Sequence, residues 1–264
     1  MSLRRSTKRR LRDGALYGVL VVAVLVLALV ADWGAVKTNF FDGETWKSLW
    51  PEIITTAAKN TVKYTVIAFA GGIVLALVLA LMKLSPLRGY RWLATGYIEF
   101  FRGLPALVVI LVIAFGVPLA FQWKPPGGPV GAGLIALILV SAAYMAETLR
   151  AGIQAVPKGQ REAAQSLGMN PFWTTLTVVL PQAIRIVIPP LTNEFILLVK
   201  DTALLVFVGM QADQVELTSF GQQGLVTSAN ASPLIAIALV YLIISIPASQ
   251  LVAHLERRQQ RATR

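Results

Sequence analysis

Long uncharged runs alternate with short polar segments along the chain. Residues 15–31 read ALYGVLVVAVLVLALVA, a run about as long as one bilayer crossing. Further apolar runs follow at 60–82, 93–120, 133–151, 188–210 and 233–253. Each crossing segment has to satisfy its own backbone hydrogen bonds in lipid, and the alternating pattern of a membrane β-barrel is absent. The pattern therefore predicts an all-α integral membrane protein with six spans.

The first apolar run allows a second interpretation, because a cleaved signal peptide also begins with basic residues. Six of them precede the run: Arg4, Arg5, Lys8, Arg9, Arg10 and Arg12. However, Ala31-Asp32-Trp33 is a poor cleavage site, and the run is longer than the apolar region of most signal peptides. We therefore expect residues 15–31 to remain as a transmembrane helix.

The segment that follows this run, residues 32–51, is polar but rich in aromatic side chains. Tryptophan favours the headgroup depth of a membrane, so the segment fits an interfacial belt. A docking surface for an external protein is the alternative. Its aromatic residues are Trp33, Phe40, Phe41, Trp46 and Trp50.

Basic residues gather in segments that six spans would place on one side of the membrane. Besides the two chain ends, these segments contain Lys83, Arg88, Arg91, Arg150, Lys158, Arg161 and Arg185. The positive-inside rule then places both termini in the cytoplasm. The net charge of +11 follows from this topology, with some attraction to anionic lipid. The sequence has no basic face interleaved with stacking aromatic residues, so it does not predict a nucleic-acid partner.

Composition agrees with a membrane protein, since 56% of the residues are hydrophobic and 14% are charged. A soluble domain usually has about 25% charged residues. The chain has no cysteine and a single histidine, His254, which excludes disulfides, thiolate sites and histidine-rich metal clusters. We expect it to bind no metal and no cofactor.

One polar stretch, residues 162–181, stands out between the apolar runs and reads EAAQSLGMNPFWTTLTVVLP. Pro157 fits the first turn of a helix, and Gly168 fits its left-handed end. Asn170 can cap a second helix with Pro171 at its first position. We expect two short helices joined at a glycine elbow, with Ala163, Ala164 and Leu167 on one side of the first. The alternative is an ordinary amphipathic connector.

The spacing E-A-A, three residues, G, nine residues, an aliphatic residue, one residue, L-P resembles the EAA loop of ABC-transporter permeases. Its positions here are Glu162, Ala163, Ala164, Gly168, Val178, Leu180 and Pro181, with Val178 where isoleucine is commoner. The segments EFFRGLPALV, AAYMAETLRAGIQAVPKGQREAA and PPLTNEFILLVKDTALL are similar to permeases that import histidine, glutamine, glutamate or arginine. The resemblance covers about residues 51–255.

This resemblance implies the type I ABC importer transmembrane fold, with five core helices preceded by one extra helix. Residues 1–50 would hold the basic tail, the extra helix and the aromatic segment. Residues 51–255 would form the permease domain with its coupling loop at 155–181, and 256–264 a basic cytoplasmic tail. The expected location is the bacterial inner membrane.

The resemblance also implies partners. The loop would sit in a groove of a cytoplasmic ATPase, present in two copies that hold ATP and magnesium. A second permease chain, identical or related, would complete the pathway, and an external solute-binding protein would deliver the amino acid. The chain has no G-x-x-x-x-G-K-[ST] phosphate loop, so it is not expected to be an enzyme itself.

Ionisable side chains inside spans are costly, which makes them candidates for the substrate pathway. Asp201 can hold an ammonium group, and Lys200 or Arg102 a carboxylate. Further candidates are Asn193, Glu194, Thr202, Glu147 and Tyr144. The alternative is structural: Lys200 and Asp201 bind separate partners, and the pairs Glu99–Arg102 and Glu147–Arg150, three residues apart, form ion pairs on one helix face.

An ATP-independent secondary transporter or channel would also explain the spans and the charges within them. So would a membrane scaffold, if the charges proved dispensable. Neither explains the EAA-like stretch. The side chain of the cargo and the choice between a homodimer and a heterodimer stay open at this level.

Overall fold

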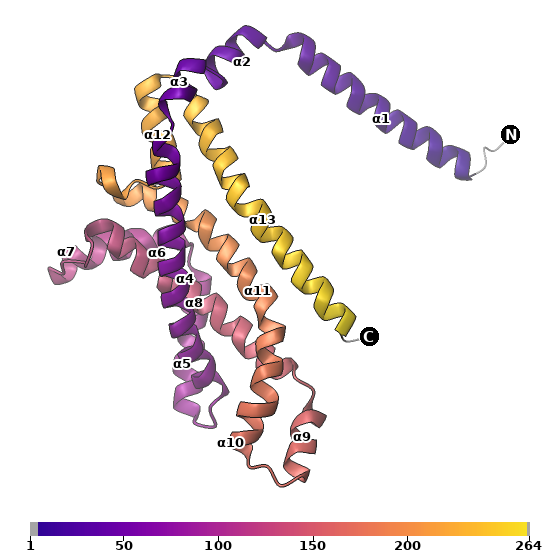
Figure 1. The fold of residues 1–264 in the computed structure, drawn as a ribbon, viewed down its shortest axis with the longest axis vertical. Helices are drawn as coiled ribbons and strands as arrows, with labels where there is room; N and C mark the ends of the chain where they lie inside the picture. Colours follow the sequence, from indigo (N-terminus) through magenta and orange to yellow (C-terminus); the bar gives the residue numbers. More distant parts are fainter. Residues whose placement is uncertain (1–4, 263–264) are drawn as a thin grey trace.

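A computed structural model describes the backbone of residues 5–262 and the side chains of residues 13–257, and this part of the chain is helical without strands (Figure 1). The basic residues Arg4–Arg12 and Arg258–Arg264 lie outside the described side chains. The α-helices are α1 (Arg5–Val30), α2 (Trp33–Phe40), α3 (Gly43–Ser48), α4 (Lys59–Leu84), α5 (Arg88–Gly103), α6 (Ala106–Leu111), α7 (Val117–Phe121), α8 (Gly128–Ala155), α9 (Lys158–Ser166), α10 (Pro171–Trp173), α11 (Leu180–Asp201), α12 (Leu217–Ser228) and α13 (Ser232–Ala262).

Wider and tighter turns interrupt these helices. Three segments are π-helical, namely η1 (Ile53–Ala58), η2 (Val112–Gly116) and η3 (Thr174–Val179), and two are 3-10, namely η4 (Thr202–Val208) and η5 (Ala212–Gln214). Pro118 and Pro181 follow η2 and η3 closely. A proline within a helix removes one backbone N–H and crowds the carbonyl four residues earlier. We attribute these two wide turns to that crowding, since a π-turn moves the carbonyl aside.

Four helical segments of the described chain are long and apolar enough to cross a membrane: Asp13–Val30, Ile53–Leu84, Gly128–Ala155 and Ser232–Arg257. A fifth crossing exists if α5 and the helical segment Ala106–Phe121 count as one. These two segments meet at an angle of 104°, so the continuous span predicted at 93–120 is wrong.

The bend follows from Pro105. A residue before proline is pushed out of the helical region, and Leu104 is extended here with φ −103° and ψ 140°. Helix α5 therefore ends at Gly103 and α6 begins at Ala106. The chain therefore breaks at this proline and does not bend gently.

The span predicted at 188–210 also has other boundaries. Helix α11 begins at Leu180 and ends at Asp201, and the tighter η4 takes over from Thr202. Because α10, η3 and α11 follow one another without a gap, residues 171–201 form one helix about 45 Å long. This helix is not among the segments that qualify as a membrane crossing by length and composition.

The core is built around α4 and α8, which lie side by side over most of their length. A Cβ atom on Gly71 would lie 2.7 Å from the Ile138 side chain, and one on Gly72 would lie 2.5 Å from Ser141 Oγ. Glycine at positions 71 and 72 therefore lets these two helices pack closely.

Helix α1 stands apart from this bundle in Figure 1, and its 18-residue apolar window is not buried anywhere. The segment after it is anchored. Ser232 Oγ accepts a bond from the Asp42 backbone N–H at 3.0 Å, and Asn230 donates to Thr45 Oγ1 at 3.0 Å. Trp46 packs against the apolar cluster of α12 and α13. Part of the aromatic segment is thus structural, while Trp33 stays exposed.

Within the described residues, three carboxylates cap helices outside the membrane-length segments, namely Asp32, Asp42 and Glu216. Asp42 accepts a bond from the Thr45 N–H at 2.8 Å, and this bond lowers the pKa of the Asp42 carboxyl. Glu216 is fully buried at the start of α12 and accepts bonds from the backbone N–H groups of Thr218 and Ser219. Burial nevertheless raises the pKa of Glu216, because desolvation outweighs these bonds.

Candidate functional site: a polar hairpin and a central pocket

The stretch singled out in the sequence forms a hairpin that projects from one end of the molecule (Figure 1). We call residues 157–181 the polar hairpin. Its first arm, α9, begins directly after Pro157. Gly168 ends that arm with φ +85°, in the left-handed region that favours glycine. The N–H of Gly168 donates to the Gln165 carbonyl at 2.9 Å and that of Met169 to the Ala164 carbonyl at 3.2 Å, which makes a Schellman motif.

The second arm begins as the sequence predicts. Asn170 Oδ1 accepts a bond from the Trp173 N–H at 2.9 Å, and Pro171 occupies the first turn. The expected glycine elbow is confirmed. The expectation of two short helices is wrong for the second, because this arm continues through η3 into α11. Side-chain bonds within the wide turn support it, such as Thr175 Oγ1 to the Pro171 carbonyl at 2.9 Å.

The two faces of the first arm differ from the expectation. Ala164 is buried in α9, which packs against η3 of the second arm, where Thr174 is also buried. Ala163 and Glu162 are exposed, and Leu167 is 86% exposed. The three residues Ala163, Ala164 and Leu167 therefore do not share a side. Alanine at 164 lets the arms approach each other, while the outer face stays free for a partner.

The tip and base of the hairpin complete this surface. Phe172 and Trp173 are 67% and 53% exposed and stack edge to face, with ring centroids 5.6 Å apart. Such exposed aromatic side chains favour contact with another protein. At the base, Leu180 is half-buried and Pro181 is exposed, where the second arm enters α11.

A second candidate site lies where α8, α11 and the break between α5 and α6 meet. We call this cavity of about 320 Å³ the central pocket. Apolar side chains form most of its wall, with four polar ones among them: Ser141, Tyr144, Glu194 and Asp201. Glu194 and Asp201 are seven residues apart, so two helical turns place them on one face of α11. A small cavity with a few polar groups is typical of a ligand site.

Arg102 adds a positive charge near the pocket. Its Cζ atom lies 5.5 Å from the centroid of the Tyr144 ring, a distance typical of a cation–π contact. Within residues 13–257 it forms no ion pair with Glu99, so the predicted pair is wrong. The break after Gly103 brings the end of α5 to this position.

The remaining pathway candidates lie elsewhere. Thr202 is buried, and its hydroxyl donates to the Val199 carbonyl at 2.7 Å. Asn193 is exposed outside the pocket. Lys200 lines a groove with Tyr241 and Ser245 of α13, away from Asp201 in the pocket. Adjacent positions 200 and 201 thus face different surroundings, as expected.

Glu147 belongs to a separate ion cluster. Its carboxylate accepts bonds from Lys83 Nζ at 3.0 Å and from Arg150 Nε at 3.1 Å. The predicted Glu147–Arg150 pair is therefore confirmed. Lys83 was not predicted to join this cluster. It comes from the end of α4 and connects this helix to α8.

Ser141 is the polar residue of the central pocket that the sequence analysis missed. It lies three residues before Tyr144, and this spacing could have indicated that both side chains share one face of the helix.

Comparison with known proteins agrees with this architecture. The family described as "Binding-protein-dependent transport system inner membrane component" matches residues 72–261. The chain belongs to this family. It is therefore a permease subunit, with helices that cross a membrane several times, and not an ATPase.

Named relatives cover most of the chain. The probable glutamine ABC transporter permease protein GlnM of Bacillus subtilis is 40% identical over 77% of this chain and 91% of its own length. The glutamine transport system permease protein GlnP of Escherichia coli is 34% identical over 81% of this chain and 97% of its own.

Solved structures support the fold. A chain of an amino acid ABC transporter with histidines has a TM-score of 0.73 and 36% identity, and the match covers 81% of this chain and 97% of that one. A chain of a bacterial alginate importer matches with a TM-score of 0.65, 16% identity and coverage of 97% and 99%, so it supports the fold alone. The predicted ABC importer fold is confirmed.

Proposed function

We propose that this chain forms half of the pathway of an ATP-driven importer of polar amino acids, with the polar hairpin as its contact to a separate ATPase. One observation carries this proposal. A single helix, residues 171–201, begins at the hairpin and ends at the central pocket, where it supplies Glu194 and Asp201. Whatever moves the hairpin therefore moves one wall of the pocket.

Coupling follows from the rigidity of this connection. Gly168 and Asn170 fix the hairpin by backbone and cap bonds, so that it keeps its shape when a partner pushes on it. Glu162, Ala163 and Leu167 face outward for that contact. Closure of an ATPase pair with ATP and magnesium bound would tilt the long helix, and rigid-body motion of this kind can switch a pathway between two openings.

The central pocket suits the charged groups of an amino acid. Asp201 and Glu194 can each bind an ammonium group, and Arg102 beside Tyr144 can meet a carboxylate. Charged side chains between crossing helices are typical of substrate pathways. Most of the lining side chains are apolar, which strengthens charge interactions relative to bulk water. The relatives named for glutamine support a polar amino acid as cargo.

The other subunits and the orientation complete the proposal. Two ATPase copies, a second permease chain and an external binding protein would assemble with this one, as the family description implies for the binding protein. Six spans would place the hairpin and both termini in the cytoplasm, which agrees with the basic residues near the hairpin.

Reconstitution tests the proposal against an ATP-independent transporter. The chain, its ATPase and its binding protein are placed in liposomes, and uptake of radiolabelled glutamine, arginine and histidine is followed. We expect uptake of at least one of these that requires ATP on the hairpin side. Full uptake without the ATPase, or ATP-dependent uptake only with ATP on the opposite side, would overturn the proposal.

A further inference from the structure

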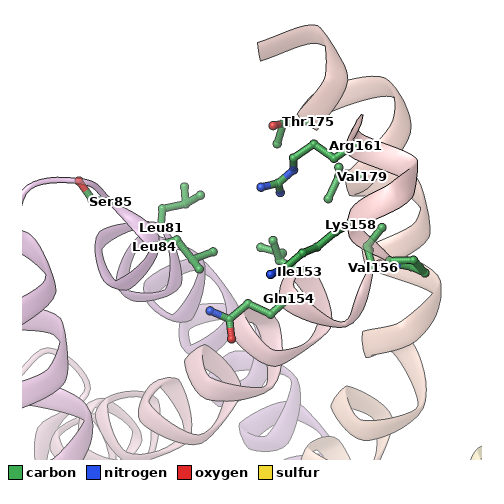
Figure 2. A pocket seen from close by; sticks show the side chains of 11 residues that line it. Leu81, Leu84, Ser85, Ile153, Gln154, Val156, Lys158, Arg161, Thr175 and Val179 are labelled. Atoms are coloured by element: carbon green, nitrogen blue, oxygen red, sulfur yellow. The ribbon is translucent and has the colours of Figure 1, made fainter. Parts of the chain in front are cut away.

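A second, larger cavity lies at the base of the polar hairpin, away from the central pocket. We call this cavity of about 700 Å³ the basic pocket. It is enclosed by the ends of α4 and α8, the start of α9 and the wide turn η3. Figure 2 shows the side chains of Lys158 and Arg161 pointing into the space opposite Leu81 and Leu84.

The two basic side chains are not bound by a carboxylate, although Glu162 follows Arg161 on the same helix. Within residues 13–257, neither Lys158 nor Arg161 forms an ion pair with a carboxylate. They are three residues apart, so one face of α9 presents both cations. An anion that enters the pocket can therefore contact an ammonium and a guanidinium group together, and phosphate suits both.

Most of the other lining side chains are apolar, and some of them come from membrane-length helices, while Ser85, Gln154 and Thr175 add neutral polar groups. Leu81 and Leu84 belong to the last turns of Ile53–Leu84, and Ile153 belongs to the last turn of Gly128–Ala155. Both helices end at the pocket, which places it at the surface of the membrane. Leu81 is 56% exposed, so the apolar wall is open to lipid chains.

We propose that the basic pocket binds the headgroup of an anionic phospholipid from the adjacent leaflet. The phosphate lies between Lys158 and Arg161, and the part of an acyl chain nearest the headgroup covers Leu81 and Leu84. Such a lipid contacts both α4 and the polar hairpin. The position of the hairpin is therefore stabilised by the bound lipid as well as by contacts within the protein. This inference does not depend on the identity of the cargo.

The test uses the purified, delipidated full chain and native mass spectrometry with phosphatidylglycerol or phosphatidylcholine of the same acyl chains. A basic side chain near an anionic lipid contributes roughly a five-fold gain in affinity, so two give about thirty-fold. We expect phosphatidylglycerol to bind about thirty-fold more tightly than phosphatidylcholine. Equal binding of the two lipids would overturn the proposal.

Variants locate the site. The double change Lys158→Gln and Arg161→Gln should remove the preference, whereas Arg88→Gln with Arg257→Gln, which loses the same charge at exposed positions, should keep it. Thr175→Trp narrows the pocket without changing charge and should also weaken binding. If both double variants lost the preference for phosphatidylglycerol equally, the preference would come from net charge alone, and the proposed site would be refuted.

Two competition experiments distinguish the lipid from other possible occupants of the basic pocket. Inorganic phosphate at millimolar concentration should not displace phosphatidylglycerol, because it lacks the acyl contacts with Leu81 and Leu84. The assembled complex with its ATPase should retain the lipid. Displacement by phosphate would assign the pocket to a free anion, and displacement by the ATPase would assign it to the subunit interface; either result contradicts the lipid.

Discussion

The polar hairpin and the central pocket are held together in opposite ways. The turn of the hairpin is closed by bonds between residues at most five apart, such as Met169 to Ala164, and its outer face is exposed. The pocket is lined by residues from three parts of the chain, near 104, 141 and 198, and its polar groups are half-buried or buried except for Tyr144.

This difference separates two tasks in one molecule. A partner can bind the hairpin without any change in the pocket wall, because the hairpin keeps its shape locally. The pocket can change shape only if helices move relative to one another. The helix at residues 171–201 connects the two, so variants in each region should damage one task and spare the other.

The largest expected effect comes from Gly168→Pro. Proline cannot adopt φ +85° and has no N–H for the bond to Gln165, and such a mismatch costs about 3 kcal/mol. The hairpin should lose its shape, and affinity for the ATPase should fall about a hundred-fold. Co-purification of the ATPase with the tagged chain measures this.

Gly159→Ala is the matched control for this variant. Gly159 lies in α9, and a Cβ there meets open space, so ATPase binding should stay at the level of the unmodified chain. Helicity and elution volume in detergent should be unchanged in both variants. Unimpaired co-purification of the Gly168→Pro chain would contradict the coupling role.

The second effect should appear at the pocket, with the hairpin intact. Asp201→Asn and Glu194→Gln each remove a charge that can bind the ammonium of the cargo, and a charged hydrogen bond contributes about 1.5–3 kcal/mol. Uptake in proteoliposomes should fall roughly ten- to a hundred-fold, while the ATPase still co-purifies.

Asn193→Ala controls for changes on the same helix, since Asn193 is exposed outside the pocket. Its uptake should match that of the unmodified chain. If Asp201→Asn transports normally, Asp201 does not contact the cargo. If it loses the ATPase instead, the two regions are not separable and the comparison fails.

The same contrast explains what the sequence could predict. Gly168, Asn170 and Pro171 act through neighbours in the chain, so residue type and order predict the elbow and its caps. The pocket depends on the break at Leu104 and Pro105. Pro105 explains why the helix breaks there, but the angle of 104° and the packing of α5 and α6 against α8 do not follow from residue type. Ser141 and the Lys83–Glu147 pair, 64 residues apart, need a fold before they can be seen.

A third prediction concerns the joint between α8 and α11, above the hairpin. A Cβ atom on Gly152 would lie 2.0 Å from Val187 Cγ1, so Gly152→Ala should force the helices apart at a cost of about 1–3 kcal/mol. The thermal midpoint should fall by several degrees. Uptake should fall while ATPase binding persists, since the joint transmits motion but does not form the contact.

Gly89→Ala in α5 serves as the control, because a Cβ there meets nothing. Its midpoint should stay the same or rise, as alanine favours a helix over glycine by about 1 kcal/mol. Equal thermal midpoints of Gly152→Ala and Gly89→Ala would show that α8 and α11 accommodate the added methyl group without strain.

The smallest expected effect concerns helix caps with and without charge. Asp42 caps α3 as Asn170 caps α10, but the Asp42 carboxyl has a pKa lowered below its usual value of 3.8 by its bond from Thr45. Its stabilisation of α3 is therefore complete above that value and is lost as pH falls through the lowered pKa. The neutral cap at Asn170 has no such dependence on pH.

Hydrogen exchange measures this difference. Exchange at the Thr45 amide, corrected for its intrinsic pH dependence, should accelerate in acid, while exchange at the Trp173 amide should not. Asp42→Asn keeps a capping oxygen and should remove the difference. Acid-sensitive exchange that persists in Asp42→Asn would assign the effect to another group at this end of the molecule.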